Sequence, residues 1–250
     1  MKIVILADSL ALPRPESVGN ITHEATYPYL LDQSLRRQWG SMAPQVIERG
    51  MRRRTIENVL DEWAEMVVFK KPEILIIHVG IVDCAPRVFR RRESRVVERL
   101  RPVWLQKLIL SFAHKHRRRI VTFRQRVYVP PERFQSHVRD VCEKARADGV
   151  KSLVFINILT PPDPLEARSP GFKANVETYN RILQAAANEP WIQLLDLNGL
   201  VRSEGRATVL LGDGIHLNER GHDMLASELT RHVSGILEAA TPVERTEIEV

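Results

Sequence analysis

The chain has 250 residues, 44% of them hydrophobic, and a formal net charge of +6 at pH 7. It is long enough to bury a sizeable core, and we expect one large domain. No apolar run is long enough to span a bilayer, no signal-peptide pattern opens the chain, and Cys84 and Cys142 are too few for a disulfide framework. We therefore expect a cytoplasmic protein.

The first predicted element is a strand that ends on Ala7-Asp8-Ser9. Its residues 3–6 form an unbroken aliphatic run, which is typical of a strand covered on both faces in a parallel sheet. Catalytic groups collect at the carboxyl ends of such strands, so Ser9 is a candidate nucleophile. Ser is also an ordinary helix-capping residue after a strand, and Ser9 taken alone fits that role better.

Strands and helices alternate along the rest of the chain. Five strands in such an alternation predict one α/β domain with a parallel sheet. The segments 11–26 and 160–171 are Pro-containing and read as loops, and the polar segment 241–250 reads as a flexible tail. The pattern predicts further strands over 45–48, 73–79, 152–158 and 192–196, and helices over 28–39, 55–69, 131–147, 173–188 and 219–237.

The composition changes over 86–126, where fourteen Lys and Arg stand against two Glu, a local charge of +12. A charge run is usually a solvated helix face, but this density favours a partner. We expect an anionic membrane surface or an anionic glycan, with a peripheral membrane position as one possibility. We do not expect nucleic acid, because no recognition motif accompanies the charges. Within the segment, a predicted amphipathic helix starts at Pro102 and carries Trp104, Leu105, Leu108, Ile109 and Phe112.

A second reactive segment, Leu211-Gly-Asp-Gly-Ile-His-Leu-Asn218, lies just before the last predicted helix. Asp213 and His216 are three residues apart on a glycine-containing loop. The carboxylate can therefore hold one imidazole nitrogen while the other faces outward, which is the base-and-orienter half of a serine triad. With Ser9 at the end of the first strand, these residues supply all three members.

These segments resemble the SGNH or GDSL hydrolases, a family of esterases, lipases and carbohydrate deacetylases. Ala7-Asp8-Ser9-Leu10 is similar to the family's Gly-Asp-Ser-Leu, and Asp213-Gly-Ile-His216 matches its closing Asp-x-x-His. The resemblance implies a flavodoxin-like three-layer sandwich with a five-stranded parallel sheet over 1–240, with 86–126 as a basic insertion. It implies Ser9 as the nucleophile, His216 as the general base and Asp213 as its orienting partner.

Two more segments resemble the blocks that form the family's oxyanion hole. Residues 49–55 are similar to Gly-x-x-Gly-Arg-Thr, and Gly80-Ile-Val-Asp83 is similar to Gly-x-Asn-Asp. The family's glycine and asparagine donors are replaced here by Arg53 and Val82, and Val82 has no side-chain donor. Loss of one such donor commonly costs about 3 kcal/mol of transition-state stabilisation. The candidate oxyanion and substrate-binding residues are Ser9, Gly50, Arg53, Arg54, Gly80, Val82 and Asp83.

The resemblance implies an esterase that removes an O-acyl group from a carbohydrate or a lipid-linked glycan through an acyl-Ser9 intermediate. Three outcomes for the altered hole remain open: Arg53 or Arg54 replaces the lost donor, turnover is slow, or the fold is kept as a binding module. An O-acyltransferase on a glycan is a further alternative. The histidines show no metal-ligand spacing and there is no glycine-rich phosphate loop, so we expect no metal and no cofactor. His78 and His222 read as structural residues.

Overall fold

Five parallel strands form the sheet in the computed structural model of the protein, which describes residues 1–240. The strands are β1 (Lys2–Ala7), β2 (Gln45–Gly50), β3 (Ile74–His78), β4 (Ser152–Ile156) and β5 (Ile192–Leu195). Their order is β2-β1-β3-β4-β5, which is the flavodoxin-like order and confirms the predicted parallel sheet. The predicted tail, 241–250, lies outside the described residues.

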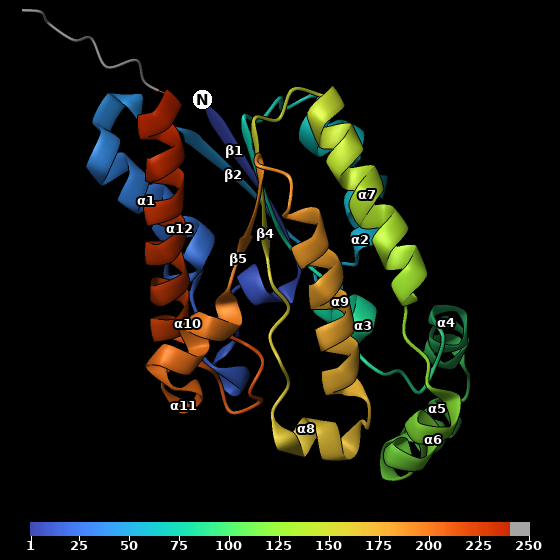
Figure 1. Cartoon of the computed structure of the whole chain (residues 1–250). Helices are drawn as coiled ribbons and strands as arrows, with labels where there is room; N and C mark the ends of the chain where they lie inside the picture. The colour runs from blue at the N-terminus through green and yellow to red at the C-terminus, as the bar shows by residue number, and fades with distance from the viewer. Residues whose placement is uncertain (241–250) are drawn as a thin grey trace, which may run out of the picture.

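Helices cover both faces of this sheet. The α-helices of residues 1–240 are α1 (Tyr27–Trp39), α2 (Ile56–Asp61), α3 (Ile81–Cys84), α4 (Arg91–Arg99), α5 (Val103–Lys115), α6 (Arg117–Arg124), α7 (Pro131–Ala147), α8 (Asp163–Arg168), α9 (Phe172–Ala186), α10 (Leu197–Glu204), α11 (Arg206–Val209) and α12 (Glu219–Ala240). Figure 1 shows α1 and α12 on one face and α2, α7 and α9 on the other.

Strand β1 shows why the sheet needs both layers of helices. Its side chains alternate between the two faces. Ile3 and Ile5 belong to the core formed with α1 and α12, whereas Val4 and Leu6 belong to the core formed with α2, α7 and α9. All four side chains are fully buried, as the unbroken aliphatic run predicts.

Two predicted segments differ from the observed elements. The single helix predicted over 55–69 is divided into α2 and a π-helical turn at Ala64–Val68. Segment 160–171, predicted as a loop, contains helix α8. That helix has six residues and none is buried, so it has no apolar stripe from which periodicity could reveal it.

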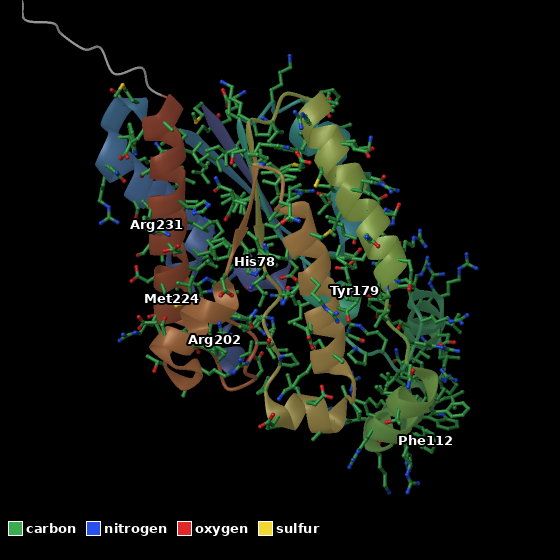
Figure 2. The ribbon with its side chains drawn as sticks, viewed as in Figure 1. His78, Phe112, Tyr179, Arg202, Met224 and Arg231 are labelled. Atoms are coloured by element: carbon green, nitrogen blue, oxygen red, sulfur yellow. The ribbon has the colours of Figure 1, made fainter. Side chains whose placement is uncertain are left out.

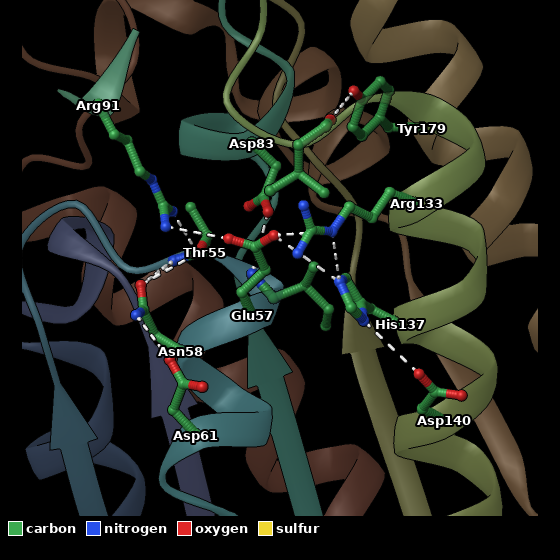
Figure 3. Close-up of polar contacts among 12 residues, drawn as sticks. Thr55, Glu57, Asn58, Asp61, Asp83, Arg91, Arg133, His137, Asp140 and Tyr179 are labelled. Carbon is green, nitrogen blue, oxygen red and sulfur yellow. Dashed lines mark hydrogen bonds and ion pairs between the residues drawn. The ribbon is translucent and has the colours of Figure 1, made fainter. Parts of the chain in front are cut away.

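The basic segment 86–126 folds into three helices, α4, α5 and α6, with a small core of Val88, Ala113 and Val121. Figure 1 shows them grouped beyond one end of the sandwich, and α6 contacts α8. We call these three helices the insertion. Arg91 fixes the insertion to α2, because its Nη1 donates to Glu57 Oε2 at 3.0 Å and its Nη2 to Thr55 Oγ1 at 2.7 Å (Figure 3).

Helix α5 is present as predicted, but its apolar face is not buried. Leu105 and Ile109 are half-buried, whereas Trp104, Leu108 and Phe112 expose 64%, 59% and 61% of their surface. Figure 2 shows Phe112 at the outer end of the insertion, away from the sheet. None of the helices in 1–240 has the length and hydrophobicity of a bilayer-spanning segment.

Candidate active site

The carboxyl ends of β1, β2 and β3 bring separate sequence segments together at one edge of the sheet. Ala7, the last residue of β1, pairs with Gly50 on β2 and with His78 on β3. Between β1 and β3 the order of strands across the sheet reverses, and ligands of open α/β sheets bind at such a point. Ser9 is the second residue after β1, so it stands where this topology places ligands.

Ser9 is the first residue of a short 3-10 helix, Ser9–Ala11, but it does not cap it. The cap is Asp8, whose Oδ1 accepts a hydrogen bond from the Leu10 N–H at 2.9 Å. The Ser9 hydroxyl is therefore available for another partner. Its oxygen lies 3.2 Å from Nε2 of His216, a residue 207 positions further along the chain.

His216 is held in turn by Asp213. Its Nδ1 lies 2.6 Å from Asp213 Oδ2, and the other carboxylate oxygen, Oδ1, accepts the backbone N–H groups of Ile215 and His216 at 2.9 Å each. Partial burial acts to raise the pKa of the Asp213 carboxyl. The hydrogen bonds from the His216 side chain and from the two backbone N–H groups outweigh burial, and hold that pKa well below its usual range. Asp213 therefore stays ionised beside the imidazole.

The loop that carries Asp213 and His216 is fixed by contacts of Arg206 and Gly214 that the sequence does not predict. Arg206 Nη2 donates to the carbonyl oxygens of Thr160 and Gly214, at 2.8 Å each. Gly214 adopts φ +69°, and a Cβ there would lie 2.6 Å from Pro162 Cγ, so the position favours glycine. Arg206 and Thr160 are 46 residues apart, and no local pattern indicates their contact.

The two replaced oxyanion positions have different environments. Arg53 adopts φ +62°, a conformation that favours glycine, and its side chain is exposed with Nη1 3.6 Å from Glu98 Oε1. Among the hydrogen bonds of residues 1–240, none uses the backbone N–H of Ser9 or of Arg53. Both groups are therefore available as donors. Val82 lines the cavity beside Ser9, with no donor on its side chain.

Arg54 and Asp83, two candidate oxyanion and substrate-binding residues, do not line the cavity beside Ser9. Arg54 is fully buried and its Nη2 donates to Glu62 Oε2 at 2.6 Å, so its guanidinium has no surface to offer a substrate. Asp83 Oδ1 accepts the Ile56 N–H at 3.0 Å and thereby caps α2 (Figure 3). Burial raises the pKa of Asp83 to about 7. The side chains of Arg54 and Asp83 thus contact the fold beneath the site.

Gly50 and Gly80 both lie close to neighbouring side chains, and Gly80 also has a backbone conformation that favours glycine. A Cβ on Gly50 would lie 2.5 Å from Leu12 Cδ2. Gly80 adopts φ +125°, and a Cβ there would lie 2.5 Å from Ile158 Cδ1. Neither glycine lines the cavity beside Ser9. The side chains of Leu12 and Ile158 thus leave little room for a Cβ at these two positions.

Two buried histidines flank Tyr27 behind the site. His222 Nδ1 accepts the Tyr27 N–H at 3.1 Å, and burial, then the charge of Arg14, lowers the pKa of His222 to about 4. His78 Nδ1 lies 3.1 Å from the Tyr27 hydroxyl oxygen, and burial lowers the pKa of His78 to about 3. Figure 2 shows His78 at the centre of the molecule. Both histidines are neutral at pH 7 and hold the start of α1.

A cavity of ≈ 360 Å³ lies beside Ser9 and His216. Apolar side chains, among them Val82 and Phe172, form part of its wall, and Arg87, Arg117 and Arg168 form another part. Within residues 1–240, no cluster of three or more His, Cys, Asp or Glu is arranged to hold a metal ion. The arrangement offers a hydroxyl nucleophile, an imidazole base with an ionised partner, and room for a substrate.

Comparisons with known proteins agree with this architecture. The model of the GDSL-like lipase/acylhydrolase family matches residues 15–224, a range that begins after Ser9. The structure is similar to a lipase/acylhydrolase from Enterococcus faecalis, with a TM-score of 0.66 and 15% identity over 94% of this chain and 97% of that chain. No curated protein matches the chain.

Two other solved structures share the fold at similarly low identity. One is an alpha/beta hydrolase enzyme from the metagenome of Lake Arreo, Spain, with a TM-score of 0.63 and 18% identity over 93% of this chain and 94% of that chain. The other is an acetylxylan esterase from Geobacillus stearothermophilus, with a TM-score of 0.61 and 17% identity over 93% of each chain. At these identities the likeness shows the fold alone.

Proposed function

Since the chain belongs to the GDSL-like lipase/acylhydrolase family, we propose that it is an esterase whose nucleophile is Ser9. The observation that carries the proposal is the continuous set of contacts from Ser9 Oγ to His216 Nε2 and from His216 Nδ1 to Asp213 Oδ2. An uncharged imidazole accepts the Ser9 proton as Oγ attacks the ester carbonyl carbon, and Asp213 stabilises the imidazolium that forms.

The remaining steps follow from the same three groups. The imidazolium returns its proton to the departing alcohol oxygen, which leaves an acyl-Ser9 ester. His216 then takes a proton from water, the water oxygen attacks the acyl carbon, and Ser9 Oγ leaves with the proton. We propose the backbone N–H groups of Ser9 and Arg53 as the donors to the negatively charged carbonyl oxygen. An O-acyl group on a carbohydrate is the proposed substrate, supported by the acetylxylan esterase among the similar structures.

The test is covalent labelling by a fluorophosphonate probe, which reacts with an activated serine. The proposal expects one phosphonyl adduct per chain, located at Ser9 by peptide mass spectrometry, and no adduct in Ser9→Ala. Ser203→Ala, which changes an exposed serine of α10, is the matched control and should label as the wild type does. Labelling elsewhere in both proteins, with Ser9 unmodified, would overturn the proposal.

Val82→Asn should raise turnover of a simple acetyl ester if the lost donor limits the rate. An asparagine N–H within reach of the oxyanion is worth up to about a hundred-fold in kcat. The measurement is kcat and KM for wild type, Val82→Asn and Val82→Leu, where leucine controls for the change in cavity shape. An unchanged kcat in Val82→Asn would show that the hole is complete without this donor. Inactivity of every variant would favour the binding module.

We also propose that the insertion rests on an anionic membrane surface. Trp104, Leu108 and Phe112 are four residues apart on α5, so they share one side of the helix, and all three are exposed. Apolar side chains beside basic ones favour a lipid interface over a soluble anionic glycan. Free thiols at Cys84 and Cys142 support a cytoplasmic location with peripheral contact.

Binding to anionic vesicles should fall steeply with salt, because each basic residue near the surface contributes roughly 1 kcal/mol and is screened within about 8 Å at physiological salt. Co-sedimentation with neutral and anionic vesicles across a salt series measures this. Arg92→Ser with Arg95→Ser removes two exposed charges, and Phe112→Ser removes apolar surface. Arg91 stays unchanged because it holds Glu57. Equal binding to both vesicle types, or none to either, would contradict the proposal.

A further inference from the structure

Three arginines from separate segments meet at the cavity beside Ser9. Arg87 follows α3, Arg117 begins α6 and Arg168 ends α8, and all three line the cavity that contains Ser9 and His216. No Asp or Glu is among the lining residues of that cavity. In the part of the chain that the structure describes, none of the three arginines has a carboxylate partner within 4.0 Å. Within residues 1–240, the cavity wall therefore carries concentrated positive charge with no carboxylate paired to it.

Two of these guanidinium groups are positioned by fixed contacts. Arg87 Nη2 donates to the Val82 carbonyl oxygen at 2.9 Å, and its guanidinium carbon lies 4.3 Å from the centre of the Tyr128 ring. Arg117 donates from Nε to Ser169 Oγ at 2.8 Å and from Nη2 to the Pro86 carbonyl oxygen at 2.9 Å. A guanidinium has five N–H donors, so each group keeps donors for a ligand.

Arg168 completes the cluster. Its side chain takes part in none of the hydrogen bonds or ion pairs described for residues 1–240, and it is exposed. Burial lowers the pKa of Arg117, and the positive charges of Arg168 and Arg87 lower it further. By contrast, Arg126 in the basic segment 86–126 is paired with Glu93 at 3.0 Å. Positive charges that are partly shielded from water repel one another, and a bound anion between them offsets the unfavourable electrostatic energy.

We propose that the arginine cluster, Arg87, Arg117 and Arg168, binds an anionic group of the ester substrate. The proposal rests on the proposed function of Ser9 and narrows its substrates to esters that carry a carboxylate or a phosphate. Guanidinium groups match the planar geometry of these anions and bind them with paired hydrogen bonds. The apolar part of the wall, which includes Val82 and Phe172, accommodates the hydrocarbon between the anion and the ester carbon.

The space beyond the arginines is also suited to a substrate larger than an acetyl ester. A second cavity of ≈ 280 Å³ is lined by the same three arginines and by residues of the insertion, among them Leu110 and Ala113. Neither Asp nor Glu lines this cavity. Because the two cavities share Arg87, Arg117 and Arg168, they meet at the cluster. The proposed anion position thus lies at the side chains that the cavity beside Ser9 and the cavity lined by the insertion have in common.

Matched pairs of esters test the proposal and show whether the charge belongs on the acyl group or on the alcohol. Nitrophenyl butyrate and nitrophenyl hemisuccinate share a four-carbon acyl chain but differ in a terminal carboxylate. Acetoxybenzoate and its methyl ester share the acetyl group but differ in the charge on the alcohol. We expect kcat/KM to favour the anionic member of one pair by about 10-fold to 100-fold, the range of one charge-assisted hydrogen bond.

Arg168→Gln should remove most of that preference, measured as the ratio of kcat/KM for the anionic and the neutral member of each pair. This arginine is the first choice for substitution because, within residues 1–240, its side chain forms no hydrogen bond or ion pair that could hold the fold. Arg168→Lys keeps the positive charge but lacks the paired N–H donors of a guanidinium, so it should restore part of the preference. Arg139→Gln removes the same charge from an exposed position on α7 and should act like the wild type on all four esters. Equal use of charged and neutral esters by the wild type would overturn the proposal.

A binding measurement separates this proposal from the function of Ser9. Inorganic phosphate, added at constant ionic strength, should raise the Tm of Ser9→Ala but not of Ser9→Ala combined with Arg168→Gln. A phosphate effect without hydrolysis of any ester would retain the anion site and reject the esterase. Hydrolysis without charge preference, and without a phosphate effect, would reject the anion site and retain the esterase.

Discussion

Ser9→Ala and His216→Ala should each lower kcat/KM for an activated ester by about 10⁴-fold to 10⁶-fold, and the double variant should be little worse than either. The reason is that hydroxyl and imidazole act in one step: without His216 the hydroxyl keeps its proton, and without Ser9 the base has no nucleophile to activate. The 3.2 Å separation of Ser9 Oγ and His216 Nε2 is the contact on which this depends.

Steady-state kinetics on purified protein measure the effect, and thermal unfolding shows whether each variant is folded. Ser9 is half-buried, and among the hydrogen bonds of residues 1–240 its hydroxyl takes part only in the one with His216, so Ser9→Ala should keep a Tm close to that of the wild type. Losses that multiply in the double variant would mean that the two residues act in separate steps. Activity retained by pure Ser9→Ala would mean that acyl transfer does not pass through this residue.

The sequence predicts the fold because its strongest patterns are local. The aliphatic runs of β1 and β3 are fully buried strands, and alternation with helices predicts the parallel order that the sheet has. The predicted resemblance to GDSL hydrolases is confirmed by the family match over 15–224. The pairing of Ala7 with Gly50 and His78 then explains why sequence blocks so far apart lie together.

The rest of the site depends on contacts that no local pattern contains. Arg54 keeps its place in the second block, yet its guanidinium is buried against Glu62 and cannot replace a lost oxyanion donor. Arg206 and Arg168 belong to segments with no motif, and they gain a role only when loops distant in sequence meet. The charge of the basic segment is evident in the sequence, but the place of each arginine is not. The structure puts Arg87 and Arg117 at the cavity, whereas Arg91 binds Glu57 and holds α2.

Asp213→Asn should lower kcat by about 10⁴-fold although the loop keeps its shape. The asparagine carbonyl oxygen can still accept the N–H groups of Ile215 and His216, which the carboxylate accepts at 2.9 Å each. Its NH₂ group then faces His216 Nδ1 and donates to it. The imidazole is thereby held in the tautomer with its proton on Nε2, so that it donates toward Ser9 and cannot accept the serine proton.

This loss should be in the chemical step and should not follow from misfolding. The measurement is kcat with the burst of released alcohol, compared across Asp213→Asn, Asp213→Ala and wild type, with Tm as the check on the fold. Asp213→Ala also removes both backbone contacts of the loop and should lose Tm as well as activity. The depressed pKa of Asp213 keeps the wild-type carboxylate ionised down to acidic pH, so its protonation does not set the acidic limb of the rate profile. A loss below about tenfold in Asp213→Asn would show that another group orients His216.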